Sequence, residues 1–403
     1  MGILGPLDHA TEVSPPAATP FHSPLLKREM PGLDTLRGVA VLSVVLYHGL
    51  HWWLPPALAI SAAARRVSLL ATPGWLGVNL FFVLSGFLIT GILLDTRSRP
   101  KYWKSFYTRR ALRILPLYVV LLFVLRFYSG VRWSYFFLCL FYMANFATAR
   151  FGLGYGPLWS LAVEEQFYLV WPVLVRGLRL RALAIACLVS LCLSPLLRYL
   201  SVSRILPMGD PYTMTWLVSD NLAMGALIAI LLRTPAATLS HIRALTLAAA
   251  VAGASLLLLG VRLHLLRRNT AAGAAFEPEP FILLFAALLL LALQFGQNPM
   301  VLRLTRPLRF YGYLSYGLYL FHLVGFGIYQ DLFTDLSHPV PLLTLGQMLL
   351  RFCAVLAFTT LFCFLSRRYF EEFFLHLKDR LAPYTSSNRT LPVQTPIASP
   401  VQP

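Results

Sequence analysis

The sequence is poor in charged residues and in cysteine. Only 12% of its 403 residues are Asp, Glu, Lys or Arg, whereas 58% are hydrophobic. A water-soluble domain carries about 25% charged residues, so this composition excludes a soluble domain of this size. The five cysteines all lie in hydrophobic segments, where a free thiol behaves as a small apolar side chain. We therefore expect no disulfide framework.

Acidic residues are scarcer than basic ones. The sequence contains 16 Asp and Glu residues and 34 Lys and Arg residues, so its formal net charge is +18. Such a balance is also found in nucleic-acid-binding proteins. Here the basic residues occupy short loops between apolar segments rather than one continuous face, which is the positive-inside pattern of membrane proteins. We therefore expect a lipid bilayer, and no nucleic acid, as the partner.

The two ends of the chain differ in composition from its middle. Residues 1–30 are rich in proline and have no long apolar core, so they do not read as a cleaved signal peptide, and we predict a disordered tail. Residues 31–370 are predicted to form one transmembrane domain. Residues 371–403 are predicted to be a cytoplasmic C-terminal tail, largely disordered after residue 382.

Eleven apolar segments follow one another in the central region. The segment 133–147 is too short for the roughly 20 residues of a crossing, so it is predicted to be re-entrant or interfacial. The predicted fold class is all-α: a polytopic transmembrane helix bundle of about ten spanning helices plus that one short segment. The predicted spans cover residues 33–54, 74–94, 111–128, 157–176, 182–199, 211–232, 243–261, 280–295, 310–330 and 342–366.

Loop charge decides between ten and eleven spans. With ten spans and a cytoplasmic N-terminus, the cytoplasmic loops receive roughly twice as many Lys and Arg residues as the opposite loops. Eleven spans would export the basic C-terminus, which the same rule disfavours. We therefore expect both termini in the cytoplasm and the chain in the inner (plasma) membrane. The loop 262–280 is an exception, because its arginines face outward, and local pairing with Glu277 and Glu279 is the one explanation at hand.

Ionisable side chains recur inside the predicted spans, where each costs at least ~2.5 kcal/mol and is a functional candidate by default. Arg37 and His48 are eleven residues apart, which brings them to nearly one face of a helix. Glu164, Glu165 and His322 lie on two other spans, and counting at 1.5 Å per residue places them near the depth of His48. Imidazole beside carboxylate is the arrangement of a general base and its orienting group.

Three arginines gather at the expected cytoplasmic end of the third span. Arg110 and Arg113 are three residues apart on one face, next to Arg109. Guanidinium forks bind phosphate oxygens bidentately, so a phosphorylated ligand could dock there. The alternative is that these arginines are positive-inside anchors at lipid headgroups.

Purely structural roles are possible for other residues as well. His322 taken alone could be a packed, hydrogen-bonded histidine. Ser85 and its neighbour Gly86 fit close helix packing in lipid better than catalysis. Asp220 is a further polar residue at comparable depth, and pairing with a neighbouring backbone group or arginine explains it as well as a functional role does.

Five blocks of this sequence resemble those of the membrane-bound acyltransferase 3 family, in the family's order and across nearly the whole hydrophobic region. They are LDTLRG at 33–38 with His48, GVNLFFVLSGFL at 77–88, RRALRILP at 109–116, LWSLAVEEQFY at 158–168 and SYGLYLFH at 315–322.

The resemblance implies transfer of an acyl group, commonly acetyl from cytoplasmic acetyl-coenzyme A, to a hydroxyl group of a carbohydrate, lipid-linked sugar or related acceptor. It implies that Arg37 and His48 are catalytic and that Arg110 and Arg113 contact coenzyme A. The chain resembles the stand-alone members, which have no fused extracytoplasmic esterase-like domain. We expect no metal and no permanently bound cofactor, because acyl-coenzyme A is a substrate.

These observations predict an integral membrane O-acyltransferase of the cell envelope. In this hypothesis His48 is the general base, or a nucleophile that carries the acyl group, and Glu164 or Glu165 orients it. Arg37 steadies the donor or developing negative charge. The rival hypothesis is a polytopic transporter of a polar or acyl-bearing solute, which has no need of a phosphate clamp. Acceptor or supporting roles are predicted for His322, Tyr316, Tyr319, Asp34, Ser85, Trp159 and Asp220.

Overall fold

The computed structural model describes residues 23–27, 29–52, 60–151, 154–333 and 343–383. Over these ranges the chain is helical and contains no β-strand, and one isolated parallel bridge joins Ile60 to Leu343. The all-α prediction is confirmed for this part of the chain. Most residues of the predicted disordered tails fall outside the described ranges, but Ser23 of the N-terminal one is buried and donates its backbone N–H to the carbonyl oxygen of Leu232.

The described residues up to position 202 form ten helical elements in close succession. They are α1 (Pro31–Tyr47), the π-helical turn η1 (His48–Trp52), α2 (Ala62–Ala71), the 3₁₀ turn η2 (Thr72–Leu76), α3 (Gly77–Thr96), α4 (Tyr102–Phe127), α5 (Trp133–Leu140), α6 (Ala144–Phe151), α7 (Pro157–Gly177) and α8 (Leu180–Val202).

The second half continues in the same way and ends in a short amphipathic helix. Its elements are α9 (Thr215–Leu231), α10 (Leu239–Arg262), α11 (Ala271–Phe276), α12 (Pro278–Phe295), α13 (Pro299–Leu304), α14 (Arg306–Phe333), α15 (Leu345–Ser366), the π-helical turn η3 (Arg367–Glu371) and α16 (Glu372–Leu381).

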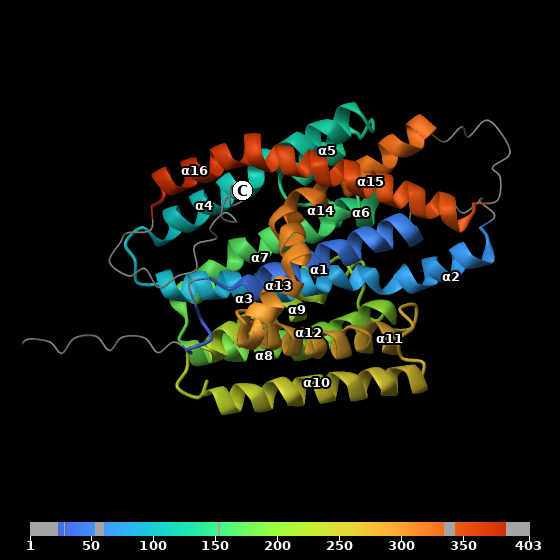
Figure 1. The fold of residues 1–403 in the computed structure, drawn as a ribbon. Helices are drawn as coiled ribbons and strands as arrows, with labels where there is room; N and C mark the ends of the chain where they lie inside the picture. Colours follow the sequence, from blue (N-terminus) through green and yellow to red (C-terminus); the bar gives the residue numbers. More distant parts are fainter. Residues whose placement is uncertain (1–22, 28, 53–59, 152–153, 334–342, 384–403) are drawn as a thin grey trace, which may run out of the picture.

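The long helices pack side by side in one bundle, with α10 along one side and α15 and α16 along the opposite side (Figure 1). α1 packs extensively on α14, and α3 packs extensively on α9. In the segment Ala62–Thr96, which ends with α3, 72% of the most apolar stretch is buried inside the bundle. The corresponding share is only 17% in α8 and in α10. The centre of the bundle therefore consists of α1, α3, α9 and α14, while α8 and α10 present apolar side chains outward.

Glycines allow the central helices to approach closely. A methyl group placed on Gly38 of α1 would lie 1.9 Å from the carbonyl oxygen of Leu308 in α14. In the second pair, a methyl group on Gly225 of α9 would lie 1.9 Å from the carbonyl oxygen of Val83 in α3. Small residues at such crossings are the usual means of helix association in lipid. The packing interpretation of the glycine next to Ser85 is confirmed, since Gly86 meets the backbone of α9 in the same way.

Six helical segments within the described ranges are long and apolar enough to cross a membrane: Pro31–Trp52, Ala62–Thr96, Leu180–Val202, Leu239–Arg262, Ala271–Phe295 and Leu345–Leu381. The long helices α4, α7 and α14 are not among them, and each carries charged or titratable residues along its length. The count of about ten spans stays a prediction.

The segment 133–147, predicted to be re-entrant or interfacial, does not form one continuous helix. It divides into α5 and α6, and Tyr142 between them has a φ of 55°, a left-handed conformation that interrupts a helix. α5 packs against α4 and α6. The short apolar segment is thus folded back against the bundle.

Candidate active site

His48 and His322 meet where α1 packs on α14. His48 is the first residue of η1, directly after α1, and His322 lies buried in α14. His322 Nε2 is 3.1 Å from His48 Nδ1, and the ring centroids are 4.9 Å apart. The two imidazoles that the sequence placed at one depth are therefore in contact. Within the described ranges no group of three or more His, Cys, Asp or Glu could hold a metal ion.

Backbone carbonyl groups decide which ring nitrogens carry protons. His322 Nδ1 lies 2.9 Å from the carbonyl oxygens of Leu318 and Tyr319, which can only accept, so Nδ1 donates. Nε2 of a neutral His322 is then an acceptor. His48 Nδ1 faces this nitrogen and the carbonyl oxygen of Val44 at 3.0 Å, so it must be a donor as well. In a neutral His48 ring, Nε2 is therefore left unprotonated, the state of a base.

A small residue lies in front of this free nitrogen. A methyl group placed on Gly156, at the start of α7, would be 3.8 Å from His48 Nε2 and 3.7 Å from Leu323. On another side, the ring of Trp52 meets the imidazole of His48 edge-on at 5.6 Å and is 52% exposed. A methyl group at Gly156 would thus fit in ordinary van der Waals contact with His48 Nε2.

The π-helical turn that carries His48 is held from α15. Arg351 donates an Nη2–H to the carbonyl oxygen of Gly49 at 2.6 Å. Gly49 has no side chain to obstruct this packing, because a methyl group there would lie 2.3 Å from the ring of Phe326 and 2.8 Å from that of Phe352. Sequence reasoning missed Arg351, although a single arginine inside the apolar segment 342–366 is a signal that could have found it.

Glu164 and Glu165 of α7 face Arg110 of α4. The guanidinium of Arg110 is 3.9 Å from Glu164 and 3.5 Å from Glu165, and its carbon lies 3.9 Å above the ring of Tyr168. The hydroxyl groups of Ser85 and Tyr168 donate to Glu164 at 2.7 and 3.1 Å. Arg110 is thus compensated by two carboxylates, and Ser85 belongs to this cluster.

The predicted contact between these glutamates and His48 does not form. His48 adjoins Gly156, and Glu164 follows eight residues later, which is about 12 Å along a helix. The start of α7, from which the depth of Glu164 was counted, lies beside His48. The partner of His48 is His322.

Arg113 lies one turn after Arg110 and has no hydrogen bond or ion pair with any described residue. The charges that act on it most are those of Arg37, Arg110, Arg367 and Asp34. Three of these four groups are cationic, and Glu371 is a further carboxylate that interacts with Arg113. We refer to Arg37, Arg113 and Arg367 as the arginine cluster.

Each of the other two members of the arginine cluster forms an ion pair with one carboxylate among the described residues. Arg37 pairs with Asp34, three residues earlier, at 3.1 Å. Arg367 of η3 lies 3.5 Å from Glu371, and its Nε is buried without a hydrogen-bond partner. Arg37 forms no hydrogen bond or ion pair with His48 in the described part of the chain, although both belong to the first predicted span. Sequence reasoning missed Arg367, which follows the last apolar segment as an ordinary positive-inside residue.

Arg109, the third arginine of the predicted donor site, has a different partner. Its Nη1 donates to the carbonyl oxygen of Ala382 at 2.8 Å and pairs with Asp379 at 3.0 Å. It therefore attaches α16 and the residue that follows it to α4. Successive residues of a helix point about 100° apart, so Arg109 and Arg110 serve different neighbours.

The predicted supporting tyrosines connect α14 to its neighbours. Tyr316 donates to the carbonyl oxygen of Ile114 at 2.7 Å and so ties α14 to α4. The hydroxyl of Tyr319 hydrogen-bonds with Ser160 of α7, and its carbonyl group accepts from the histidine pair. Trp159 packs edge-on against an aromatic ring of α3. Of these residues, Tyr319 is the one that contacts His322 directly.

Asp220 is paired with a buried arginine. Arg198 of α8 is 1% exposed and Asp220 of α9 is fully buried, and their charged groups are 2.6 Å apart. A second carboxylate, that of Glu279, lies 2.7 Å from the same guanidinium. The structural interpretation of Asp220 therefore accounts for its burial without any contact with the histidine pair.

One arginine of the loop 262–280, Arg268, pairs with an acidic residue of the same loop. Arg268 lies 3.4 Å from Glu277, and its guanidinium is sandwiched between the rings of Trp75 at 3.3 Å and Tyr212 at 4.3 Å. The expected local pairing is confirmed for Arg268.

Comparison with known sequences shows which protein family the chain matches. A family model described as an acyltransferase domain matches residues 30–368. A candidate peptidoglycan O-acetyltransferase of Bacillus subtilis (strain 168) is 35% identical over 222 residues, which is 47% of this chain and 31% of that protein. A candidate O-acetyltransferase of Staphylococcus aureus (strain MSSA476) is 37% identical over 173 residues, 38% of this chain and 26% of that protein.

A third relative is the peptidoglycan O-acetyltransferase of Listeria monocytogenes serovar 1/2a, which is 33% identical over 170 residues, 36% of this chain and 24% of that protein. The chain thus spans less than a third of the length of these curated relatives. No solved structure matches the chain significantly.

Proposed function

The chain belongs to the acyltransferase family whose domain model matches residues 30–368, and we propose that it is an O-acyltransferase. Its apolar helices make it an integral membrane protein. Relatives are named for O-acetylation, in two cases of peptidoglycan. The proposal is therefore transfer of an acetyl group from acetyl-coenzyme A to a hydroxyl group of a cell-envelope carbohydrate, with both termini of the chain in the cytoplasm.

The observation that carries this proposal is the free Nε2 of His48 beside a second, buried imidazole. In the proposed reaction this nitrogen takes the proton of the acceptor hydroxyl while the hydroxyl oxygen attacks the thioester carbonyl carbon. The carbon–sulfur bond then breaks, and the proton on His48 passes to the departing thiolate of coenzyme A. His322 accepts from Nδ1 of His48, which orients the ring and stabilises it while it is protonated.

The arginine cluster supports binding of the donor. Coenzyme A carries several phosphate groups, and Arg113 with Arg37 and Arg367 offers guanidinium groups with few carboxylate partners. Arg110 contributes charge to the same region, but Glu164 and Glu165 fix its position. We propose that Arg113, rather than Arg110, makes the principal phosphate contact.

The same geometry also permits a covalent route, in which Nε2 of His48 attacks the thioester and carries the acetyl group before the acceptor receives it. The two routes differ in what remains when acceptor is withheld. Radiolabelled acetyl-coenzyme A added to purified protein alone would leave acid-sensitive label on the chain in the covalent route. Direct transfer leaves the protein unlabelled.

The function itself is tested by incubating purified protein with radiolabelled acetyl-coenzyme A and membrane extract and identifying the labelled product. We expect an alkali-labile O-acetyl ester on a carbohydrate. His48→Ala should lower the rate at least about 10²-fold while coenzyme A still binds. The matched control is His241→Ala, because His241 lies exposed near the start of α10 and bonds only to local groups. Absence of coenzyme A binding by the unmodified chain, or full turnover by His48→Ala, contradicts the proposal.

A further inference from the structure

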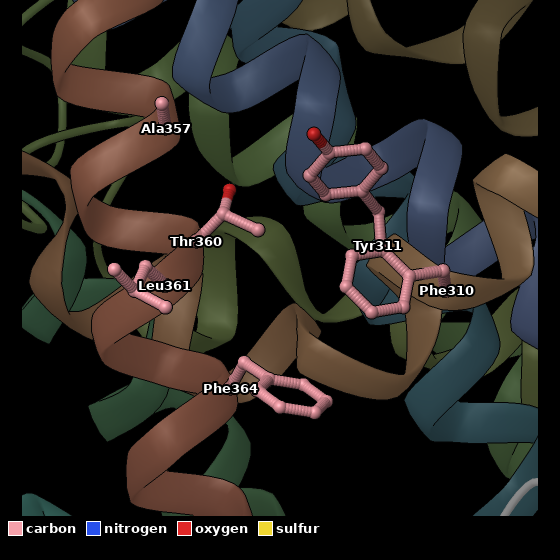
Figure 2. A pocket seen from close by; sticks show the side chains of 6 residues that line it. All are labelled: Phe310, Tyr311, Ala357, Thr360, Leu361 and Phe364. Carbon is pink, nitrogen blue, oxygen red and sulfur yellow. The ribbon is translucent and has the colours of Figure 1, made fainter.

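A groove of about 370 Å³ opens between α14 and α15 (Figure 2). Its walls are mostly apolar and come from two helices, as the labelled side chains show. They are Phe310 and Tyr311 of α14, and Ala357, Thr360, Leu361 and Phe364 of α15.

The groove lies on a face of the bundle that has the character of a lipid-exposed surface. The apolar window of the segment Leu345–Leu381, which includes α15, is only 28% buried. Leu361 is 58% exposed and Phe364 is 43% exposed. An apolar groove of this kind in a bilayer is in contact with lipid chains, and dispersion contacts favour filling it. The occupant must therefore be apolar over most of its length.

One end of this groove is basic. α14 and α15 run antiparallel, because Phe310 packs on Phe364 while Gly325, further along α14, meets Thr359. The start of α14 therefore lies beside the end of α15. Arg306 is the first residue of α14 and lies one turn before Phe310, on the same side of the helix and toward that end of the groove.

Arg368 lies one turn after Phe364 and supplies a second guanidinium at the same end. Arg306 and Arg368 are both exposed, and neither forms an ion pair with a residue that the structure describes. The nearest acidic residues in sequence are Glu371 and Glu372, and Glu371 pairs with Arg367. An apolar groove with two exposed arginines one turn beyond its end has the apolar and cationic parts that an anionic lipid requires.

We propose that this groove binds one acyl chain of an anionic phospholipid, whose phosphate lies between Arg306 and Arg368. Basic pockets between membrane helices bind acidic headgroups, and guanidinium groups bind phosphate strongly. Phe310 precedes His322 by twelve residues, about 18 Å of helix, so this site is separate from the histidine pair. The bound lipid would connect α15 to α14, the helix that carries His322. The proposal does not depend on the proposed catalytic activity.

The test is native mass spectrometry of the full chain in detergent, titrated with phosphatidylglycerol or with phosphatidylcholine. We expect tighter binding of phosphatidylglycerol. The double substitution Arg306→Gln with Arg368→Gln should weaken that binding about 30-fold, since each arginine near an anionic headgroup is worth about 1 kcal/mol. The control is Arg179→Gln with Arg181→Gln, which removes the same charge from two exposed arginines at the start of α8.

Occupancy of the groove is tested separately with Ala357→Phe, which fills it from an exposed position on α15. This change should weaken phosphatidylglycerol binding at least tenfold, whereas Ala248→Phe on the exposed face of α10 should not. The proposal is overturned by equal affinity for the two lipids, by equal effects of the two arginine pairs, or by unchanged binding in Ala357→Phe. A dimer that Ala357→Phe dissociates would assign the groove to a second copy of the chain, which also overturns it.

Discussion

His48 and His322 are 274 positions apart in the sequence, yet a hydrogen bond joins their rings. Each ring has a defined set of neighbours, because carbonyl groups of its own helix take up the Nδ1 protons. This arrangement gives the two histidines different expected roles. His48 presents a free nitrogen to the reacting groups, and His322 positions it.

Substitution of His322 tests that division of roles. His322→Ala removes one of the two acceptors of His48 Nδ1–H and leaves the carbonyl oxygen of Val44, so kcat should fall about 10²-fold while the KM for acetyl-coenzyme A changes little. His322→Gln places an amide oxygen near the former Nε2 and should recover part of the loss. Steady-state kinetics of both variants make the measurement. If Gln is no better than Ala although both variants fold, hydrogen bonding to His48 is not the role of His322.

Gly156 provides a second test at the scale of one residue. Its backbone is helical, with φ −42° and ψ −50°, so alanine fits, and the added methyl group would only touch His48 Nε2 at 3.8 Å. We expect Gly156→Ala to retain activity within severalfold. Gly156→Leu should lower kcat/KM for the acceptor about 10²-fold, because its larger side chain occupies the space beside the base, without changing the affinity for coenzyme A. Equal activities of the two variants would place the acceptor elsewhere.

At the scale of the element, η1 is the segment on which the candidate site depends. A π-helical turn is wider than an α-helical one and frequently occurs at functional sites. Here it begins at His48 and is anchored by the bond from Arg351 to Gly49. A charged side chain in an apolar helix is costly. The hydrogen bond to Gly49 explains why an arginine occupies position 351.

Arg351→Met keeps an apolar side chain of similar length but removes the donor to Gly49. A hydrogen bond from a charged donor is worth about 1.5–3 kcal/mol, so kcat should fall about 10- to 100-fold as the turn loosens. Arg351→Lys should restore part of the activity. The control is Arg126→Met, since Arg126 lies at the far end of α4 and stacks on Trp133. A loss that Lys does not relieve, or one that Arg126→Met shares, would argue against positioning of η1.

At the scale of the whole molecule, the buried group formed by Arg198, Asp220 and Glu279 joins α8 to α9 and α12. Removing one partner of a buried pair leaves the other charge uncompensated. Arg198→Met should therefore lower the free energy of unfolding by about 3–5 kcal/mol. The double variant with Asp220→Asn should be more stable than the single one, because one of the two carboxylates that lost their partner, the fully buried one, is gone.

Thermal unfolding of the purified chain in one detergent, followed by tryptophan fluorescence, measures both variants. The folded fraction of each should keep its activity, because these residues make no contact with the histidine pair. Loss of activity in a double variant that is stably folded would instead support the functional interpretation of Asp220. The same experiment thus decides between the two interpretations that the sequence left open.

Composition and pattern by themselves determined the all-helical fold over the described residues and the membrane setting, because apolar helices of spanning length leave few alternatives. They also singled out His48, His322, Arg37 and Arg113 as costly polar residues in lipid. The motif blocks indicated the family that the comparisons show. These are properties of single segments, and they can be read without knowing which helices are neighbours.

Only the tertiary structure decided the partners of those residues. Glu164 and Glu165 meet Arg110 instead of His48, Arg109 holds α16, and Arg351 reaches η1 from a helix more than 300 positions later in the chain. The physical reason is that depth along a helix fixes one coordinate of a side chain. The other two depend on which helices pack together, and close contacts at small residues such as Gly38 and Gly225 determine that packing.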